Sequence, residues 1–272
     1  MKFYTNVTRY GNQLLYRGYE NGHKKQEKIK YKPTLFVNTP KPTDWKSLDG
    51  SPVAPIQMDS MRDAKEWINA NKSTAGRHIY GNDRYIPAFI NDEFPGTIEF
   101  DRNKINVTSF DIEVASDEGF PQPDVADYPV ISIAMKNNID NIYYVWGLND
   151  YDVSEALMKD HVVIYKKCAS ESELLSQFIL HWSHPAHCPD IITGWNIRFF
   201  DVPYLVNRTL KILGEDMVKK YSPWGLVDRY DVKMMGREQV TYDLKGISTI
   251  DYLELFQKFG YSYGTQESYR LD

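Results

Sequence analysis

Three acidic residues in two segments of the 272-residue chain have the types and spacing of a metal-dependent site. Asp111 and Glu113 lie in the run Val107-Thr-Ser-Phe-Asp-Ile-Glu-Val114, which predicts a buried strand. Strand alternation would place both carboxylates on one face, about 7 Å apart. Paired carboxylates repel unless a cation such as Mg²⁺ or Mn²⁺ neutralises them. The pair predicts a metal site, although a solvated strand face explains a lone Asp-x-Glu more often.

The third acidic residue lies in the segment Thr193-Gly-Trp-Asn-Ile-Arg-Phe-Phe-Asp-Val-Pro-Tyr204. This pattern predicts a strand that ends at Gly194, a loop that carries Asn196, and a helix that begins at Asp201. Pro203 suits the first turn of that helix. The backbone would fix the direction of the Asp201 carboxylate, which suits a ligand, but the same residue would also serve as a plain helix cap.

The elements around these carboxylates predict a mixed sheet flanked by helices. Candidate strands at 107–114, 130–135, 141–146 and 162–165 come first. A helix opened by the capping box at Ser170, a short strand at 190–193 and a helix over 201–213 follow. Strands first and alternating helices later are typical of such a sheet.

The first part of the chain predicts a separate, small α+β module. Residues 1–33 alternate apolar and polar positions between turns at Gly11 and at Asn21-Gly22, which indicates a strand meander. Ser60 and Asp63 can cap a helix after a loop. Residues 1–105 hold 17 basic and 12 acidic side chains, whereas residues 106–272 hold 15 and 25. We therefore expect two domains, 1–105 and 106–272, with different electrostatic roles.

Composition excludes several other classes of protein. No stretch approaches the roughly 18 to 20 apolar residues of a membrane span, and the first residues lack a secretory signal. Cys168 and Cys188 are too few for a disulfide framework and have no paired zinc-site spacing. We expect a cytoplasmic protein with two free thiols and no membrane partner.

The two acidic segments resemble the first two exonuclease motifs of family B DNA polymerases. The similarity rests on Phe-Asp-Ile-Glu at 110–113 and Asn-x-x-x-Phe-Asp-x-Pro-Tyr at 196–204. The flanking residues, such as Ile250-Asp-Tyr-Leu-Glu-Leu-Phe256, are similar to replicative polymerases of T-even-like tailed phages. The resemblance implies an α/β (α+β) fold: an RNase H-like 3′→5′ exonuclease domain behind a small α+β amino-terminal domain.

The resemblance also implies a two-ion site for Mg²⁺ or Mn²⁺ and a proofreading hydrolysis of DNA phosphodiester bonds. Asp111 would bridge both ions, Glu113 would bind the ion that activates water, and Asp201 would hold the second ion. The family's third motif, a tyrosine followed four residues later by an aspartate, does not occur before Asp272. We therefore expect a truncated exonuclease domain with impaired activity in isolation. The alternative is a nucleic-acid-binding or regulatory module without catalysis.

Several further residues are expected to bind DNA because of the same resemblance. Phe120 is placed like the aromatic that stacks on a frayed primer end, although it would also suit an ordinary loop. The segment 236–246 resembles the hairpin that parts primer from template, or it is a plain surface hairpin. The expected DNA-binding residues are Phe120, Asn196, Phe200, Tyr204, Arg237 and Lys245.

The implied partners are the single-stranded 3′ end of a primer, template DNA, and the remaining polymerase domains or a separate carboxyl-terminal chain. A sliding clamp would bind only through the absent part. The basic run His23–Lys32 suits template or RNA phosphates, and equally a solvated strand face.

Two features near the expected site have no assigned role. Arg198 could place a cation beside it. The group His181, His184, His187 and Cys188 looks like a zinc cluster, but Pro185 interrupts it and a connecting loop is favoured.

Overall fold

The computed structural model describes residues 1–81, 84–116, 119–155, 161–234, 237–264, 266, 268, 269 and 271. The chain divides into two compact units, Met1–Phe100 and Asp101–Asp272, and each is described by itself. The assignment of domains with a boundary near residue 105 stays a prediction.

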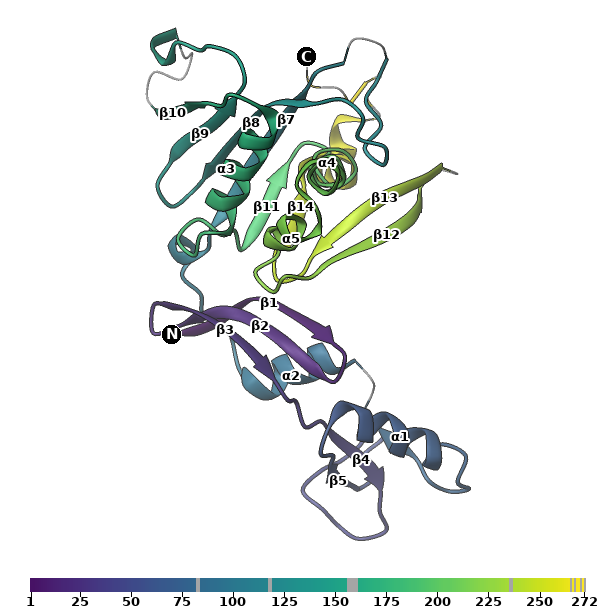
Figure 1. Ribbon diagram of the computed structural model, residues 1–272. Helices are drawn as coiled ribbons and strands as arrows, with labels where there is room; N and C mark the ends of the chain where they lie inside the picture. Colours follow the sequence, from purple (N-terminus) through teal and green to yellow (C-terminus); the bar gives the residue numbers. More distant parts are fainter. Residues whose placement is uncertain are drawn as a thin grey trace. The chain divides into compact units, whose positions relative to one another are not determined.

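The first unit begins with the expected antiparallel meander of β1 (Lys2–Tyr10), β2 (Gln13–Glu20) and β3 (His23–Ile29) (Figure 1). Both turns are two residues long, since Tyr10 pairs with Gln13 and Glu20 with His23. Asn21 and Gly22 have φ of 51° and 80°. Positive φ at both positions matches the turn that best suits the twist of paired strands, so the Asn-Gly signal is confirmed.

A second three-stranded sheet in this unit places β4 (Thr34–Asn38) between β5 (Val53–Gln57) and β6 (Ile79–Tyr80). The predicted helix is α1 (Met61–Asn71), and the Ser60 hydroxyl caps it by accepting the Asp63 N–H at 3.2 Å. Helix α2 (Tyr85–Glu93) completes the unit. Its apolar core is formed by Leu14, Tyr16, Tyr31, Leu35, Met58, Met61, Ala64, Tyr85 and Phe89.

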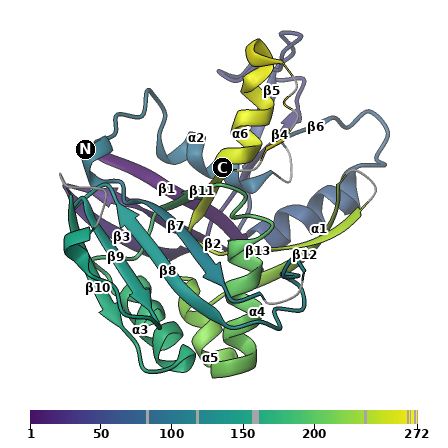
Figure 2. The ribbon, with the colours of Figure 1, turned by 90° about the horizontal axis from the view of Figure 1, so that it is seen from above.

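The second unit is built on a six-stranded sheet with the order β10-β9-β8-β7-β11-β14 (Figures 1 and 2). The strands are β7 (Val107–Val114), β8 (Val130–Asn137), β9 (Ile142–Gly147), β10 (Val162–Lys167), β11 (Ile191–Gly194) and β14 (Ser248–Asp251). Strands β7, β8 and β9 pair antiparallel, whereas β11 and β14 run parallel to β7. This mixed α/β arrangement is the expected RNase H-like fold.

Four helices accompany the sheet: α3 (Glu171–Ser183), α4 (Asp201–Leu213), α5 (Glu215–Val218) and α6 (Tyr252–Phe259). Helix α3 packs on β8 and β9 (Figure 1). It opens as predicted, because the Ser170 hydroxyl accepts the Glu173 N–H at 3.3 Å and Glu173 accepts the Ala169 N–H at 2.8 Å. Short 3₁₀ helices span Arg102–Lys104, Val153–Glu155, Lys219–Tyr221 and Gly260–Tyr263.

A two-stranded hairpin projects beside α4 and consists of β12 (Val227–Met234) and β13 (Arg237–Leu244) (Figure 1). The segment 236–246 is therefore only the second half of this hairpin. Its partner strand precedes it, because Val227 pairs with Leu244 and Met234 with Arg237. The strands are joined through residues 235–236, which lie outside the described part.

Histidine rings of the zinc-like segment pack against each other and against the sheet. The His181 ring stacks on His187 with centroids 4.0 Å apart and lies 4.4 Å from the Tyr144 ring. In the part of the chain that the structure describes, no three histidine, cysteine or acidic side chains form a group that could hold a metal ion. The segment is an aromatic layer at the end of α3. Cys168 and Cys188 are buried free thiols.

Burial, and to a lesser degree charge repulsion from His187, lower the pKa of His181 to about 4. Lys166 and His184 act in the same direction, while Asp140 opposes them. The Nε2 atom of His181 is buried without a hydrogen-bond partner among the described residues. The packed ring is therefore held in its neutral form.

No helix in the described ranges is long and apolar enough to cross a membrane.

We expect acid to destabilise the second unit through His181. The unfolded state binds the proton near the ordinary pKa of 6.5, whereas the folded state resists it until about 4. Stability is complete above the unfolded pKa and falls as the pH drops, by on the order of 2 kcal/mol by pH 4. Urea unfolding between pH 7 and 4 should show a shallower loss in His181→Phe. The exposed neighbour change His184→Gln should keep most of the wild-type slope, and equal slopes for His181→Phe and wild type would contradict the assignment.

Candidate active site

Asp111 and Glu113 lie on the exposed face of the central strand β7. Thr108, Phe110 and Ile112 alternate with the exposed positions and point to the core, so the alternation predicted from the sequence is confirmed. Strand β8 pairs Asp111 with Ala134 and Glu113 with Ser132. These small partners leave space beside the two carboxylates.

Asp201 reaches the same strand from the first residue of α4. Its side chain is 2% exposed, and its Oδ1 accepts the Ile112 N–H at 3.1 Å. Ile112 is the residue between Asp111 and Glu113, so segments 89 positions apart meet here. The structure therefore brings Asp201 onto the Asp-x-Glu strand.

Close packing at Gly194 makes this approach possible. Strand β11 runs beside β7 and ends at Gly194, where a Cβ would lie 2.4 Å from Ile197 Cγ2 and 2.9 Å from the Phe110 carbonyl oxygen. Any larger residue would push the following loop away from β7. Glycine is required because the loop must fold back directly over the strand before α4 begins.

The electrostatics of this junction disfavour two charged carboxylates. Burial, and to a lesser degree the charge of Asp111, raise the pKa of Asp201 to about 8, against the opposing effect of the Ile112 N–H. Partial desolvation by the surrounding protein also raises the pKa of Asp111, although its face of β7 is open to solvent. A divalent cation between such oxygen donors would supply the missing positive charge, so the donor set fits Mg²⁺ or Mn²⁺. Among the described residues, Glu113 does not combine with two other acidic, histidine or cysteine side chains into a group that could hold a metal ion.

A fourth carboxylate, Asp251, organises the loop between Gly194 and Asp201. It is 3% exposed; Oδ1 accepts the N–H groups of Asn196 and Leu253 at 3.1 and 2.9 Å, and Oδ2 accepts the Arg198 N–H at 2.9 Å. Asp251 ends β14 and caps α6. Sequence reasoning missed this role, although Asp251-x-x-Glu254 has the spacing of a capped helix start.

Asn196 and Arg198 are both oriented by this loop. Asn196 has φ of 62°, a left-handed conformation that asparagine tolerates better than most residues. The Arg198 Nη1 atom donates to both Glu254 carboxylate oxygens at 2.9 and 3.1 Å, and the guanidinium lies 5.2 Å from the Phe199 ring centroid. The structure therefore pairs the cation of Arg198 with α6.

A groove of about 380 Å³ opens beside the junction. One wall is the loop after β7, with Phe120 69% exposed and its ring 5.3 Å from the Phe200 ring. The opposite wall is the hairpin strand β13. The lining residues are Phe120, Gln122, Pro123, Asp124, Asn196, Phe199, Phe200, Glu238, Gln239 and Val240. Phe120, Asn196 and Phe200, all expected to bind DNA, therefore meet in one groove.

Two of the other three expected DNA-binding residues, Tyr204 and Lys245, have internal partners instead. Tyr204 is fully buried, and its hydroxyl bonds to the backbone of Tyr128. Lys245 is 8% exposed and forms ion pairs with Asp243 and Asp228, so its charge is already neutralised within the fold. The prediction for Arg237 falls on a side chain outside the described residues.

The fold and the paired carboxylates define a nuclease-type site, and sequence comparisons agree. Residues 82–272 match the family described as DNA polymerase family B, exonuclease domain, and the chain belongs to this family. It is 32% identical to the DNA-directed DNA polymerase of Escherichia phage RB69 over 297 residues, which cover 100% of this chain and 32% of that relative.

Other relatives repeat the pattern. Identity to the DNA-directed DNA polymerase of Enterobacteria phage T4 is 32% over 96% of this chain and 31% of that relative. The DNA polymerase delta catalytic subunit of Dictyostelium discoideum is 32% identical over 39% of this chain and 9% of its own length. The chain spans about a third of the two phage polymerases.

We expect Asp251→Ala to destabilise the second unit by about 3 kcal/mol, because the change strands buried backbone donors and removes a helix cap. Urea-induced unfolding measures this loss. Asp231→Ala is the matched control, since the Asp231 carboxylate forms an exposed ion pair with Arg229 at 3.3 Å, and its effect should stay within about 0.5 kcal/mol. Equal midpoints for the two variants would argue against Asp251 as the anchor of the loop.

Proposed function

We propose that this chain provides carboxylates of a metal-dependent 3′→5′ exonuclease site that hydrolyses DNA phosphodiester bonds, the proofreading activity of a polymerase. The observation that best supports this proposal is the hydrogen bond at Ile112, which joins the Asp201 carboxylate to the strand of Asp111 and Glu113. Membership of the family B exonuclease domain supports the same reaction.

The proposed ligands are Asp111, Glu113 and Asp201, and the ions are Mg²⁺ or Mn²⁺ in a two-ion site. When bound, they would supply a nucleophilic water and neutralise the charge that gathers on the phosphate. Asp111 and Asp201 share the strongest electrostatic need for a cation, since each is desolvated and Asp111 raises the pKa of Asp201. Glu113 is the proposed ligand that shares the exposed face of β7 with Asp111.

The groove beside the carboxylates is proposed to hold the single-stranded 3′ end. Aromatic faces accept any base by stacking, so Phe120 and Phe200 suit binding without sequence preference. Asn196 adds a polar group to the lining of the groove. These walls suit a single-stranded 3′ terminus, which must be bound whatever its base is. They suit a duplex less well.

A second candidate function is a nucleic-acid-binding or regulatory module without catalysis. One observation favours it: across the described ranges, no three acidic, histidine or cysteine side chains form a group ready to hold a metal ion. Under this alternative the groove would bind a strand, while the carboxylates would not support hydrolysis.

The amino-terminal unit is a further candidate for contact with template DNA or RNA. Strand β3 is largely exposed and carries much of the basic run. However, Lys25 pairs with Glu20 and Glu27, and Lys32 pairs with Asp59, which neutralises part of this charge. Contacts with the remaining polymerase domains are proposed from the relatives' longer chains alone.

We expect Asp111→Ala and Asp201→Ala each to reduce nucleotide release at least about a hundredfold, because each removes a ligand that binds the ions. The measurement is release from a 3′-labelled single strand with Mn²⁺ or Mg²⁺, together with binding of the same strand. Asp216→Ala is the control, since Asp216 is an exposed residue of α5 that pairs with Lys219.

Wild-type rates in both alanine variants would refute the proposed site. If the wild-type chain binds the strand but releases no nucleotide with or without a supplied carboxyl-terminal polymerase fragment, and Asp111→Ala binds equally well, the non-catalytic module is the correct function. A chain that neither binds nor cuts the strand would exclude both.

A further inference from the structure

One face of α4 carries polar side chains that all contact the loop between β7 and β8. The residues are Tyr204, Asn207, Arg208 and Lys211, at the i, i+3, i+4 and i+7 spacing that lines one side of a helix. The loop is the segment whose residues 120 to 124 form one wall of the groove. We call these four residues the α4 polar stripe.

The buried end of the stripe bonds to the loop backbone. The Tyr204 hydroxyl donates to the Tyr128 carbonyl oxygen at 2.7 Å and accepts the Tyr128 N–H at 3.1 Å. The Asn207 side-chain amide donates to the Pro123 carbonyl oxygen at 2.8 Å. Each of these bonds fixes backbone atoms, so they define the path of the loop whatever its side chains are.

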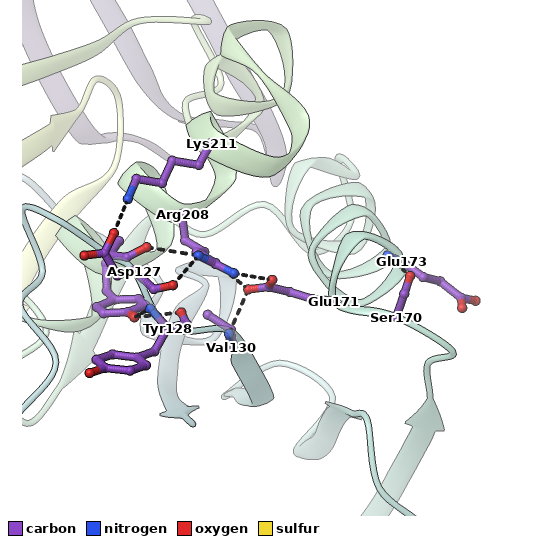
Figure 3. Close-up of polar contacts among 10 residues, drawn as sticks. Asp127, Tyr128, Val130, Ser170, Glu171, Glu173, Arg208 and Lys211 are labelled. Atoms are coloured by element: carbon purple, nitrogen blue, oxygen red, sulfur yellow. Dashed lines mark hydrogen bonds and ion pairs between the residues drawn. The ribbon is translucent and has the colours of Figure 1, made fainter. Parts of the chain in front are cut away.

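Arg208 ties the same loop to α3, as Figure 3 shows. Its guanidinium bonds both Glu171 carboxylate oxygens at 2.7 Å and donates to the carbonyl oxygens of Ala126 and Asp127 at 3.2 and 2.8 Å. Glu171 also accepts the Val130 N–H at 2.8 Å. Both side chains of the ion pair are only 12% exposed, so water screens it little. Lys211 adds an exposed ion pair with Asp127 at 2.7 Å.

Asn207 connects both walls of the groove. Its amide nitrogen holds Pro123 on the loop wall, while its Oδ1 accepts the Tyr242 hydroxyl at 2.6 Å from strand β13 of the hairpin wall. The side chain itself does not line the groove. A single buried amide therefore relates the position of one wall to that of the other.

We propose that the α4 polar stripe is a positioning device for the groove, and that it sets how tightly the 3′-terminal nucleotide is held by placing Phe120. This inference rests on the proposed function. Tyr204, Asn207 and Arg208 act through the loop and are positioning residues. Helix α4 begins at Asp201, whose carboxylate is bonded to β7. One rigid helix therefore places both a carboxylate of the proposed metal site and the groove wall that receives the DNA strand.

Hydrogen–deuterium exchange of the full chain tests the positioning without any enzymatic activity. We expect Tyr204→Phe, which removes only the hydroxyl, to speed exchange of the Tyr128 amide about fivefold or more, because that amide loses its acceptor. Asn207→Ala should speed exchange over the peptide 119–130. Leu210→Ala, an exposed position on α4, is the control and should change neither. Unchanged exchange in both stripe variants would overturn the inference.

Nucleotide release and strand binding then test the effect on affinity. In Tyr204→Phe and Asn207→Ala we expect KM for a single strand to rise roughly 3- to 10-fold while kcat stays within about twofold. In a Phe120→Ala background the same changes should add nothing to KM, because the residue through which they act is gone. Equal effects in both backgrounds would show that the stripe does not act through Phe120.

The two possible failures are distinguishable. If the wild-type chain releases no nucleotide with or without a supplied carboxyl-terminal polymerase fragment, the proposed function fails, and anisotropy of a labelled single strand replaces KM as the measure of affinity. If the wild-type chain cuts normally and the stripe variants show neither faster exchange nor weaker affinity, only the positioning role fails. Because Tyr204→Phe keeps the buried ring, loss of folding does not confuse either outcome.

Discussion

The hydrogen bond from the Ile112 N–H to the Asp201 carboxylate joins the two parts of the site. It places a buried acid against the strand that already carries Asp111 and Glu113. Such a contact is unfavourable for a charged group, and the raised pKa of Asp201 reflects it. Neighbouring elements nevertheless hold the Asp201 carboxylate in this position. Gly194 allows the loop to fold back over β7, and Asp251 fixes that loop by accepting the backbone N–H groups of Asn196 and Arg198.

Helix α4 connects this constraint to the groove. Its first residue meets β7, and its polar stripe binds the loop that carries Phe120. The proposed catalytic carboxylate and the proposed strand-binding groove are thereby built on one rigid element, which would keep their relative position constant. The hairpin wall is included in the same arrangement through Tyr242 and Asn207. The proposed binding of any base would need this rigidity, because stacking alone does not fix the position of a strand.

The differences between expectation and structure have a common cause. Lys245 and Tyr204 were expected to bind DNA because they lie in segments that resemble a DNA-contacting hairpin and motif. The structure instead uses Lys245 in ion pairs with Asp228 and Asp243, and Tyr204 in bonds to Tyr128. A polar side chain in a motif has either an internal or an external partner, and the sequence does not say which. The hairpin was recognised only in its second strand because its first strand, residues 227–234, carries no motif of its own.

The sequence by itself determined the local features. Alternation placed Asp111 and Glu113 on one face of β7, the Asn-Gly turn joined β2 to β3, and the cap at Ser170 began α3, because these patterns depend on neighbours within a few residues. Two motifs were enough to indicate the family. Only the tertiary structure decided that Asp201 bonds to Ile112, that Asp251 anchors the loop, and that Asn207 connects both groove walls. These contacts join residues 35 to 89 positions apart, so they exist only once the strand order of the sheet brings those segments together.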